Sequence, residues 1–428
     1  MNRDELRALS KEELVELVLK LQRPAKTSRT SSKPPSTDRK EGRREKRARS
    51  KPGGAKPGHK GHFRALCEQP DDVVEHRPDR CSGCGHVFAS EAAGEVIGAF
   101  DSVDLPPVMP IITRHQRLAC ACPGCGARVK AAPPVSGSPF GPNIQALALY
   151  LKHVQHVSYQ RLQAMFADVF GLTVSQGALG NMFRRTQAAF DAKKTTILAH
   201  LRTAQAVASD ETGVRIEGVN AQHWVFRAPG VVLHETAFSR AAQVVRDVMG
   251  GHCPAFWTSD RYSAQQGHGE RHQTCLAHLA RDIAFALEVS EDPAPFRLKL
   301  WMDDVFALWR NLADIAASTL VRKRRKLDDR IGEILCARSE CDVTSALLRK
   351  IANARDQLLT FLDAPDLVQP TNNDCERALR PAVINRKVTN GFRSSWAAHA
   401  DAALRTVIDT ERLAGVSPYH AIQNTIGA

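Results

Sequence analysis

AQAVASDETGVRIEG, residues 204–218, alternates apolar and polar side chains in the manner of a β-strand. AQHWVFRAPGVVLHETAF, residues 221–238, shows the same alternation, and PAFWTSDRYS, residues 254–263, predicts another strand. A helix is expected between these two stretches at about 239–249. RHQTCLAHLARDIAFAL, residues 271–287, predicts a strand followed by a helix. The chain is therefore expected to form a mixed α/β region that begins at about residue 204.

The segment before this region is predicted to be helical, from residue 140 to residue 205. An amphipathic helix is expected from Tyr159 to Phe170, with Gly171 at its end. Ser175 is expected to cap a second helix that runs through Phe183. Two helices across such a short turn fit a helix-turn-helix and an ordinary helical hairpin equally well.

Acidic residues stand at the ends of two of the predicted strands. Asp210 is expected at the end of the first strand and Asp260 at the end of a later one. Packing explains such residues poorly, whereas carboxylate oxygens are the ligands that Mg²⁺ prefers. Glu376, in TNNDCERALRP, forms either a plain surface ion pair with Arg380 or a third carboxylate of such a site. Glu211 is a rival to Asp210, but successive residues of a strand face opposite sides.

Three carboxylates can hold two divalent cations about 4 Å apart, one activating the attacking oxygen and the other stabilising the leaving oxygen. Two strand-end aspartates and one helix glutamate are the arrangement that an RNase H-like sheet provides. Residues 295–363, between the second aspartate and the glutamate, are predicted to be helical throughout.

The net charge of +13 is concentrated in one short arm. Residues 21–64 contain 15 Lys+Arg and 3 Asp+Glu, and their Pro, Gly, Ser and Lys content gives no periodic apolar face. Such a basic linker is either a solvated spacer or a nucleic-acid-binding arm that displaces phosphate counterions, and the second interpretation is favoured. The arm residues expected to contact DNA include Lys33, Arg43, Arg44 and Lys60.

A short amphipathic helix is expected before the arm. Ser10 and Glu13 form a capping box at its start, and leucines follow on one face. The helix is too short to be stable alone in water. It either pairs with a copy of itself as a short coiled coil or packs on the rest of the protein.

Two pairs of cysteines have the spacing of a zinc site. Cys81 and Cys84 form CSGC, Cys122 and Cys125 form CPGC, and a glycine follows each second cysteine. Four thiolates can bind zinc tetrahedrally, and the turn within each pair brings both sulfurs to one side. Cys120 could replace Cys122 as a ligand, and all of these residues could instead be unrelated buried thiols.

Composition excludes several other classes of protein. The chain has 428 residues with 43% apolar content, which is enough for two to four domains, and it has no apolar run long enough to span a membrane. The first residues, MNRDELRALSKEELVELVLK, are charged throughout and are not expected to be a signal peptide. The 11 cysteines are therefore expected to be reduced thiols or metal ligands.

Several stretches resemble one known family, the transposases of the insertion-sequence sixty-six family. They are TSSKPPSTD, PGHKG, the CSGC and CPGC pairs, SDETG, SDRYSAQ, HQTCLAHLARD, TNNDCERALRPAVINRK and TERLAGVSPYHAI. The likeness runs nearly from end to end. It implies a DDE transposase with an RNase H-like catalytic core and a helical insertion before the glutamate.

The resemblance implies that Asp210, Asp260 and Glu376 form the catalytic triad and hold Mg²⁺ or Mn²⁺. Zn²⁺ would bind at the cysteines, and the family leaves Cys120 and Cys122 as alternatives there. Near Glu376, the residues expected around the DNA phosphates are Arg377, Arg380, Arg386 and Lys387.

Asn372, Asn373 and Asp374 are expected to cap the helix that carries Glu376. His278 and Arg281 are expected to contact Glu376 or the scissile phosphate, unless the histidine is structural.

The predicted fold class is multidomain α/β (α+β). The expected parts are an N-terminal helix (1–22), a basic linker (23–64), a zinc-ribbon-like module (65–135), a helical region (136–203), the first part of an RNase H-like core (204–290), a helical insertion (291–365), and the last part of the core with C-terminal helices (366–428).

The expected partners are the DNA of the element ends and of the target, further copies of this chain and small accessory proteins, in the bacterial cytoplasm at the nucleoid. The alternatives are a non-catalytic, zinc-containing DNA-binding regulator and a nuclease that uses the same carboxylates without strand transfer.

Overall fold

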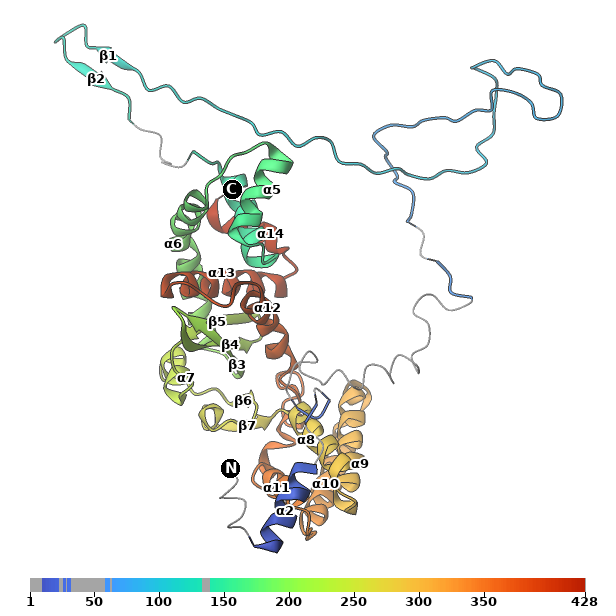
Figure 1. Cartoon of the computed structure of the whole chain (residues 1–428), viewed down its shortest axis with the longest axis vertical. Coiled ribbons are helices and arrows are strands. Elements are labelled where there is room, and N and C mark those ends of the chain that lie inside the picture. Colours follow the sequence, from blue (N-terminus) through green and yellow to red (C-terminus); the bar gives the residue numbers. More distant parts are fainter. Residues whose placement is uncertain are drawn as a thin grey trace. The chain divides into compact units, whose positions relative to one another are not determined.

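The computed structural model (Figure 1) describes residues 10–22, 26–27, 29–31, 58–61, 64–132 and 139–427. The chain forms two units, Arg39–Ile111 on the one hand and Met1–Asp38 with Ile112–Ala428 on the other. Lys33, Arg43 and Arg44 lie outside the described residues.

A five-stranded mixed sheet forms the centre of the second unit. Its strands, in the order β5-β4-β3-β6-β7, are β5 (Val231–Ala237), β4 (Val219–Ala228), β3 (Ala206–Ile216), β6 (Phe256–Ser259) and β7 (Arg271–Thr274). β3 pairs antiparallel with β4 and parallel with β6, while β4 pairs antiparallel with β5 and β6 parallel with β7. The strands predicted from the alternating sequence are all confirmed, and β3 is the strand where the two pairing modes meet.

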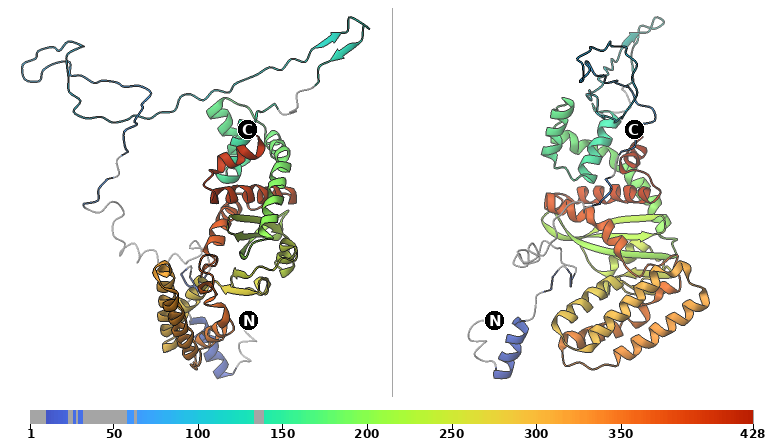
Figure 2. Two further views of the ribbon diagram at one scale, coloured as in Figure 1. Left: turned by 180° about the vertical axis from the view of Figure 1, so that it is seen from behind. Right: turned by 90° about the vertical axis from the view of Figure 1, so that its right-hand side faces the viewer.

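Helices cover both faces of this sheet (Figure 2). On one face, Trp224, Phe226 and Trp257 pack against α6 (Gln176–Leu201) and α7 (Ala242–Met249). On the other face, Val225 and Val232 pack against α12 (Asn373–Thr389). Because side chains of a strand alternate between faces, this division also assigns a face to every residue of β3.

The open edge of β5 is covered by α13 (Ser395–Leu413). The Thr406 hydroxyl accepts a hydrogen bond from the His234 backbone N–H at 2.8 Å. The Thr410 hydroxyl accepts from the Val232 N–H at 3.1 Å and donates to the Val232 carbonyl at 3.0 Å. Two helix side chains therefore replace the strand that would otherwise complete this edge.

Between β7 and α12 the chain is almost entirely helical, as the sequence predicts. The elements are α8 (Leu276–Val289), α9 (Pro293–Arg310), η4 (Leu312–Asp314), α10 (Ala317–Leu335), α11 (Asp342–Ala352), η5 (Arg355–Gln357) and η6 (Thr360–Leu362). Their buried side chains, among them Trp301, Ile331 and Phe361, form a core of their own with α8.

The region before the sheet is also helical, with α4 (Pro142–Leu149), the π-helix η2 (Tyr150–Val154), α5 (Tyr159–Phe170) and α6. Gly171 ends α5 with a left-handed φ of 62°, and the Ser175 side chain caps α6, as expected. α6 continues to Leu201 rather than ending near Phe183, because Phe190 and Leu201 are also buried. The last helix is α14 (Pro418–Ile426).

The N-terminal helix α2 (Lys11–Gln22) starts with the predicted capping box. The Ser10 N–H donates to the Glu13 carboxylate at 2.7 Å, and the Glu13 N–H donates to the Ser10 hydroxyl at 3.2 Å. Among the helices of the described ranges, none is long and apolar enough to cross a membrane.

Candidate active site

Asp210 lies on the face of β3 that α12 covers. Ala208, two residues earlier, packs with α12 on this face, so Asp210 points the same way. The prediction that Asp210 ends its strand is wrong, because β3 continues to Ile216. Val214 and Ile216 are buried with Ala398 of α13, which stabilises the longer strand.

Asp260 is the first residue after β6. In the parallel pairing of β3 with β6, Ala206 lies opposite Phe256 and Ala208 opposite Thr258. Asp260 lies two residues beyond the last of these pairs, as Asp210 does, and its charge acts on Asp210, whose pKa it raises. One Asp260 carboxylate oxygen accepts a hydrogen bond from the Tyr262 N–H at 2.8 Å, which orients this side chain in the turn.

Glu376 lies in the first turn of α12, which is fixed to β3 at both ends. At the start, the Asn372 side-chain amide donates to the Ser209 carbonyl at 2.8 Å, directly before Asp210. At the far end, the Phe392 N–H donates to the Arg215 carbonyl at 2.8 Å. Gly391 has a φ of 105°, and a Cβ there would lie 2.2 Å from that carbonyl. The helix therefore presents Glu376 to the same face of the sheet as Asp210.

The expected capping of α12 by its asparagine and aspartate side chains is wrong. Asn372 is the N-cap but its side chain makes no capping hydrogen bond, because its amide is used on Ser209. Its backbone N–H donates to the Cys275 sulfur at 3.1 Å, directly before α8. The Asp374 carboxylate instead lies 3.1 Å from Arg377 and 3.4 Å from Arg227. Asn372 is thus a bridge between β3, α8 and α12.

Two residues of α8 hold the Glu376 carboxylate. Arg281 donates to it at 3.0 Å, and the His278 Nε2 lies 3.7 Å from the same oxygen. Burial lowers the pKa of His278, and the neighbouring Arg281 charge lowers it further. The contact of both residues with Glu376, one of the two alternatives expected for them, is confirmed.

The acids of this site repel one another. Burial raises the pKa of Asp210 well above its ordinary value, and the charges of Glu211, Asp260 and Glu376 raise it further. Buried carboxylates that destabilise each other in this way are suited to a bound cation, which would offset both the burial and the repulsion. In the described ranges, however, no three His, Cys, Asp or Glu side chains lie close enough together to hold one ion. Glu376 is bound to α8 instead.

Glu211 lies on the opposite face of β3 from Asp210 and its oxygens are already used. Gln265 donates to one oxygen at 2.6 Å, and Arg240 donates to the other at 2.7 Å. Arg240 also stacks on Tyr262, with the guanidinium carbon 3.8 Å from the ring centre. Glu211 therefore ties the segment after β6 to β3 rather than competing with Asp210 as a ligand.

Gln265, Gln266 and Arg240 are residues that the sequence analysis did not single out. Gln265 is fully buried and also accepts from the Ser209 hydroxyl. Gln266 donates to the Asp260 carbonyl at 3.1 Å. Both glutamines lie in the polar run SDRYSAQQ after a buried strand, which was a signal that could have identified them.

The basic residues expected near Glu376 divide into two groups. Arg377, Arg380 and Lys387 are exposed on α12. Arg386 is half-buried and donates to the Gly213 carbonyl, so it fixes α12 to β3. Lys60 is exposed in the other unit.

The two cysteine pairs form turns of the same kind. In the first, the Gly85 N–H donates to the Cys81 carbonyl at 2.9 Å, and in the second, the Gly126 N–H donates to the Cys122 carbonyl at 2.8 Å. Both glycines have a positive φ, 76° and 71°. The second turn joins β1 (Ala119–Ala121) to β2 (Arg128–Lys130).

The chemistry of these turns suits a metal-bound thiolate. Backbone N–H groups of Cys84 and Gly83 lower the pKa of Cys81, and those of Gly124 and Cys125 lower the pKa of Cys122. Cys120 lies inside β1, opposite Val129, and not in the turn.

Comparison with known proteins agrees with both parts. Residues 137–400 match the description "Transposase IS66 family", and residues 78–126 match "zinc-finger binding domain of transposase IS66". The matches define a transposase that carries a zinc-finger domain. Because the first match covers more than half of the chain, this chain belongs to the IS66 transposase family. "Uncharacterized protein y4jD" of Sinorhizobium fredii is 23% identical over 385 residues, 82% of this chain and 74% of that protein.

Proposed function

We propose that the chain is a DDE transposase in which Asp210, Asp260 and Glu376 hold two divalent cations, Mg²⁺ or Mn²⁺. One observation carries the proposal: β3 and β6 pair in parallel up to two residues before Asp210 and Asp260, and α12 with Glu376 covers the sheet face of Asp210. The mutual repulsion that raises the pKa of Asp210 supports it.

The core that holds these residues would be RNase H-like. The arrangement supporting this has three antiparallel strands, β5, β4 and β3, continued on the other side of β3 by two parallel strands, β6 and β7. The helices from α9 to η6 would be an insertion in this core. They follow β7 and α8 in the chain and precede α12, the helix that carries Glu376.

Two successive displacements at phosphorus would take place at this site. In the first, a water oxygen bonds to a phosphorus at the element's end and the bond to the 3′ oxygen breaks, which frees a 3′-hydroxyl. In the second, the oxygen of that hydroxyl bonds to a phosphorus of target DNA and the bond from this phosphorus to its own 3′ oxygen breaks, so the element is joined to one side of the target and a target 3′-hydroxyl is released. When bound, the cations would supply charge stabilisation for the attacking and leaving oxygens.

The chain's own residues would position these groups. Asp210 is held by its strand and Asp260 by the Tyr262 N–H, so both carboxylates are fixed before the cations arrive. Arg281 would neutralise Glu376, with His278 beside the same oxygen, and both would release or share this carboxylate on cation binding. The positive charge of Arg281 would then lie next to the phosphate.

DNA would be bound by several parts of the chain. On α12 these are Arg377, Arg380 and Lys387, with Arg386 positioning the helix, and in the arm they are Lys33, Arg43, Arg44 and Lys60. Zn²⁺ would be held by Cys81, Cys84, Cys122 and Cys125. Two element ends have to be joined, so further copies of this chain and small accessory proteins are the proposed partners.

The test is cleavage of DNA that carries the element's own ends, with Mg²⁺ or Mn²⁺. Asp210→Asn, Asp260→Asn and Glu376→Gln should each lower the cleavage rate by about two orders of magnitude or more, with DNA binding retained. Asp314→Asn, an exposed acid between α9 and α10, is the matched control and should cleave normally. If wild type binds DNA but never cuts, even with cell extract added, the protein is a regulator. If it cuts without joining ends to a target, it is a nuclease.

A further inference from the structure

The first half of α10 carries a block of basic residues that contains no acid. Residues 317–327 read ASTLVRKRRKL, so five cations follow one another from Arg322 to Lys326. The acids of this helix, including Asp328 and Asp329, begin only after the block. The helix is therefore strongly positive in its first half and mixed in its second.

Most of this charge is exposed and has no neutralising partner. α10 packs on its neighbours through Leu327, Ile331 and Ile334, which leaves the basic side chains outside the core. Among the residues that the structure describes, no ion pair is formed by Arg322, Lys323 or Lys326. Long exposed cations of this kind are suited to a polyanion.

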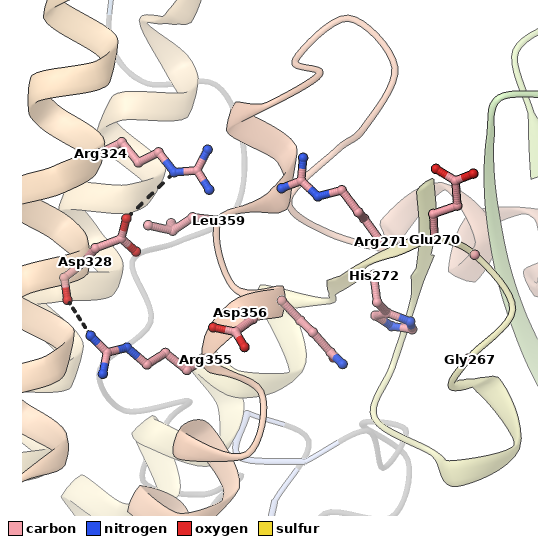
Figure 3. Close-up of a pocket in the computed structure, with 11 residues that line it drawn as sticks. Gly267, Glu270, Arg271, His272, Arg324, Asp328, Arg355, Asp356 and Leu359 are labelled. Atoms are coloured by element: carbon pink, nitrogen blue, oxygen red, sulfur yellow. Dashed lines mark hydrogen bonds and ion pairs between the residues drawn. The ribbon is translucent and has the colours of Figure 1, made fainter. Parts of the chain in front are cut away.

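Of the two remaining cations, Arg325 lies 4.0 Å from Asp329 of the next turn. The other, Arg324, lies in the wall of a cavity of about 820 Å³. Figure 3 shows Arg324 of α10 and Arg271 of β7 pointing toward one another across this cavity. Both guanidinium groups bind Asp363. Arg355 lines the same cavity and donates to the Asp328 carbonyl at 3.4 Å. The cavity therefore gathers three arginines from the sheet and from the helical region, and Glu270, Asp328 and Asp356 line it as well.

Short side-chain contacts connect the cavity to the carboxylate site. Gln357 in the cavity wall donates to the Gln266 side chain at 3.2 Å, and Gln266 donates to the Asp260 carbonyl at 3.1 Å. His272, also in the wall, lies 3.2 Å from the Ser259 hydroxyl, directly before Asp260. The backbone of Asp260 is therefore linked to the cavity wall through two side chains, Gln266 and Gln357.

We infer that Arg322, Lys323 and Lys326, with Arg324 and Arg271 at the cavity, bind the phosphate backbone of the DNA that runs from the cleavage site onto α10. The inference rests on the proposed function, because it takes the carboxylate site as the place where DNA is cut. Contacts to phosphates position DNA without reading its sequence. The helical region would thus hold the duplex beside the scissile bond.

The experiment measures the binding of full-length protein to a short random-sequence DNA duplex over a range of salt concentrations. The triple variant Arg322→Gln, Lys323→Gln, Lys326→Gln should lower the slope of log K against log salt by about 2–3, the value for three lost phosphate contacts. The matched control removes three exposed cations of α7, α9 and α11 that likewise form no ion pair among the described residues, Arg246→Gln, Arg310→Gln and Arg349→Gln, and should leave the slope unchanged. Thermal melts of both variants verify that the helices remain folded.

A wild-type slope in the first triple variant overturns the inference and assigns the block to an acidic protein surface instead. An equal loss of slope in both triple variants also overturns it, because net charge alone would then explain the effect. The proposed function fails in a different way, namely when wild type binds the duplex with this slope but no metal-dependent cleavage is found.

Discussion

Asp210 and Glu211 are adjacent acids with different surroundings, because neighbouring residues of a strand face opposite sides of the sheet. Glu211 is held by Arg240 and Gln265. Asp210 accepts a hydrogen bond from the Glu211 N–H at 2.9 Å and otherwise meets burial and the charges of other acids. Asp210 therefore differs from Glu211 in the free-energy cost of keeping its carboxylate ionised, and this cost distinguishes the candidate site.

Asp210→Asn is expected to stabilise the protein in metal-free buffer at neutral pH. Folding raises the pKa of Asp210, so the protein loses stability as the pH rises from the ordinary pKa of an aspartate to the raised pKa. Asparagine carries no charge at any pH, and the variant therefore keeps the stability that wild type loses. The melting temperature should rise by roughly 2–4 °C. Added Mg²⁺ should raise the melting temperature of wild type and not that of the variant, and a variant that melts below wild type would contradict this account. Asp314→Asn should behave as wild type in both respects.

At the scale of elements, the position of Glu376 depends on how α12 is attached. Asn372 fixes the start of the helix to β3 and α8, and Gly391 allows its end to return to β3. α13 in turn completes the edge of β5 through threonine hydroxyls. The sheet and its helices are thus joined by specific polar contacts as well as by the apolar core.

Thr406→Val is expected to lower the free energy of unfolding by about 1–3 kcal/mol, because the buried His234 N–H loses its acceptor while the side-chain shape is kept. Chemical denaturation measures this change. Thr425→Val on α14 is the control, since that hydroxyl binds only the Ala421 carbonyl of its own helix at 2.6 Å. A loss in the control as large as in Thr406→Val would show that the strand contact is not the cause.

The cysteine turns allow a test of which thiol binds zinc. Cys122→Ser should reduce the zinc content of the purified protein, because the turn directs backbone N–H groups at this sulfur. Cys120→Ser should keep the wild-type zinc content, because Cys120 belongs to β1. Elemental analysis by mass spectrometry decides between them, and the reverse result would assign Cys120 as the ligand.

At the scale of the whole molecule, a buried ionic cluster joins the helical region before the sheet to α13. Asp401 accepts from Arg405 at 2.6 Å and lies 2.8 Å from the His153 Nδ1 of η2. Burial alone would raise the pKa of Asp401, but Arg405 and His153 outweigh it and hold this pKa well below its ordinary value. The cluster therefore couples two parts of the chain that are about 250 residues apart.

Asp401→Asn is expected to lower the free energy of unfolding by about 3–5 kcal/mol at neutral pH, because Arg405 loses its buried partner. Because folding depresses the pKa of Asp401, its contribution is present above the ordinary value and is lost as the pH falls through the region below about 4. The variant should therefore lose less stability than wild type on acidification, as measured by denaturation at several pH values. Asp329→Asn, an exposed acid of α10, is the control, and parallel acid profiles of wild type and Asp401→Asn would contradict the prediction.

The sequence by itself determined the local structure and the nature of the chemistry. Period-two alternation predicted the strands, Gly171 and Ser175 marked helix ends, and the two residues within each cysteine pair predicted a turn, because each signal depends on neighbouring residues only. The acids Asp210 and Asp260 stood out for the same reason, since a charge inside an apolar run is visible without a fold.

Tertiary structure decided what depends on residues far apart in the chain. Asn372 looked like a helix cap, but the Ser209 carbonyl competes for its amide and is 163 positions away. β3 continues past Asp210 because α13 covers Val214 and Ile216, and Arg281 reaches Glu376 from a helix 95 positions earlier. Such partners are brought together by the packing of the sheet and the helices. Residues so far apart in the chain leave no periodic pattern in the sequence from which their contact could be predicted.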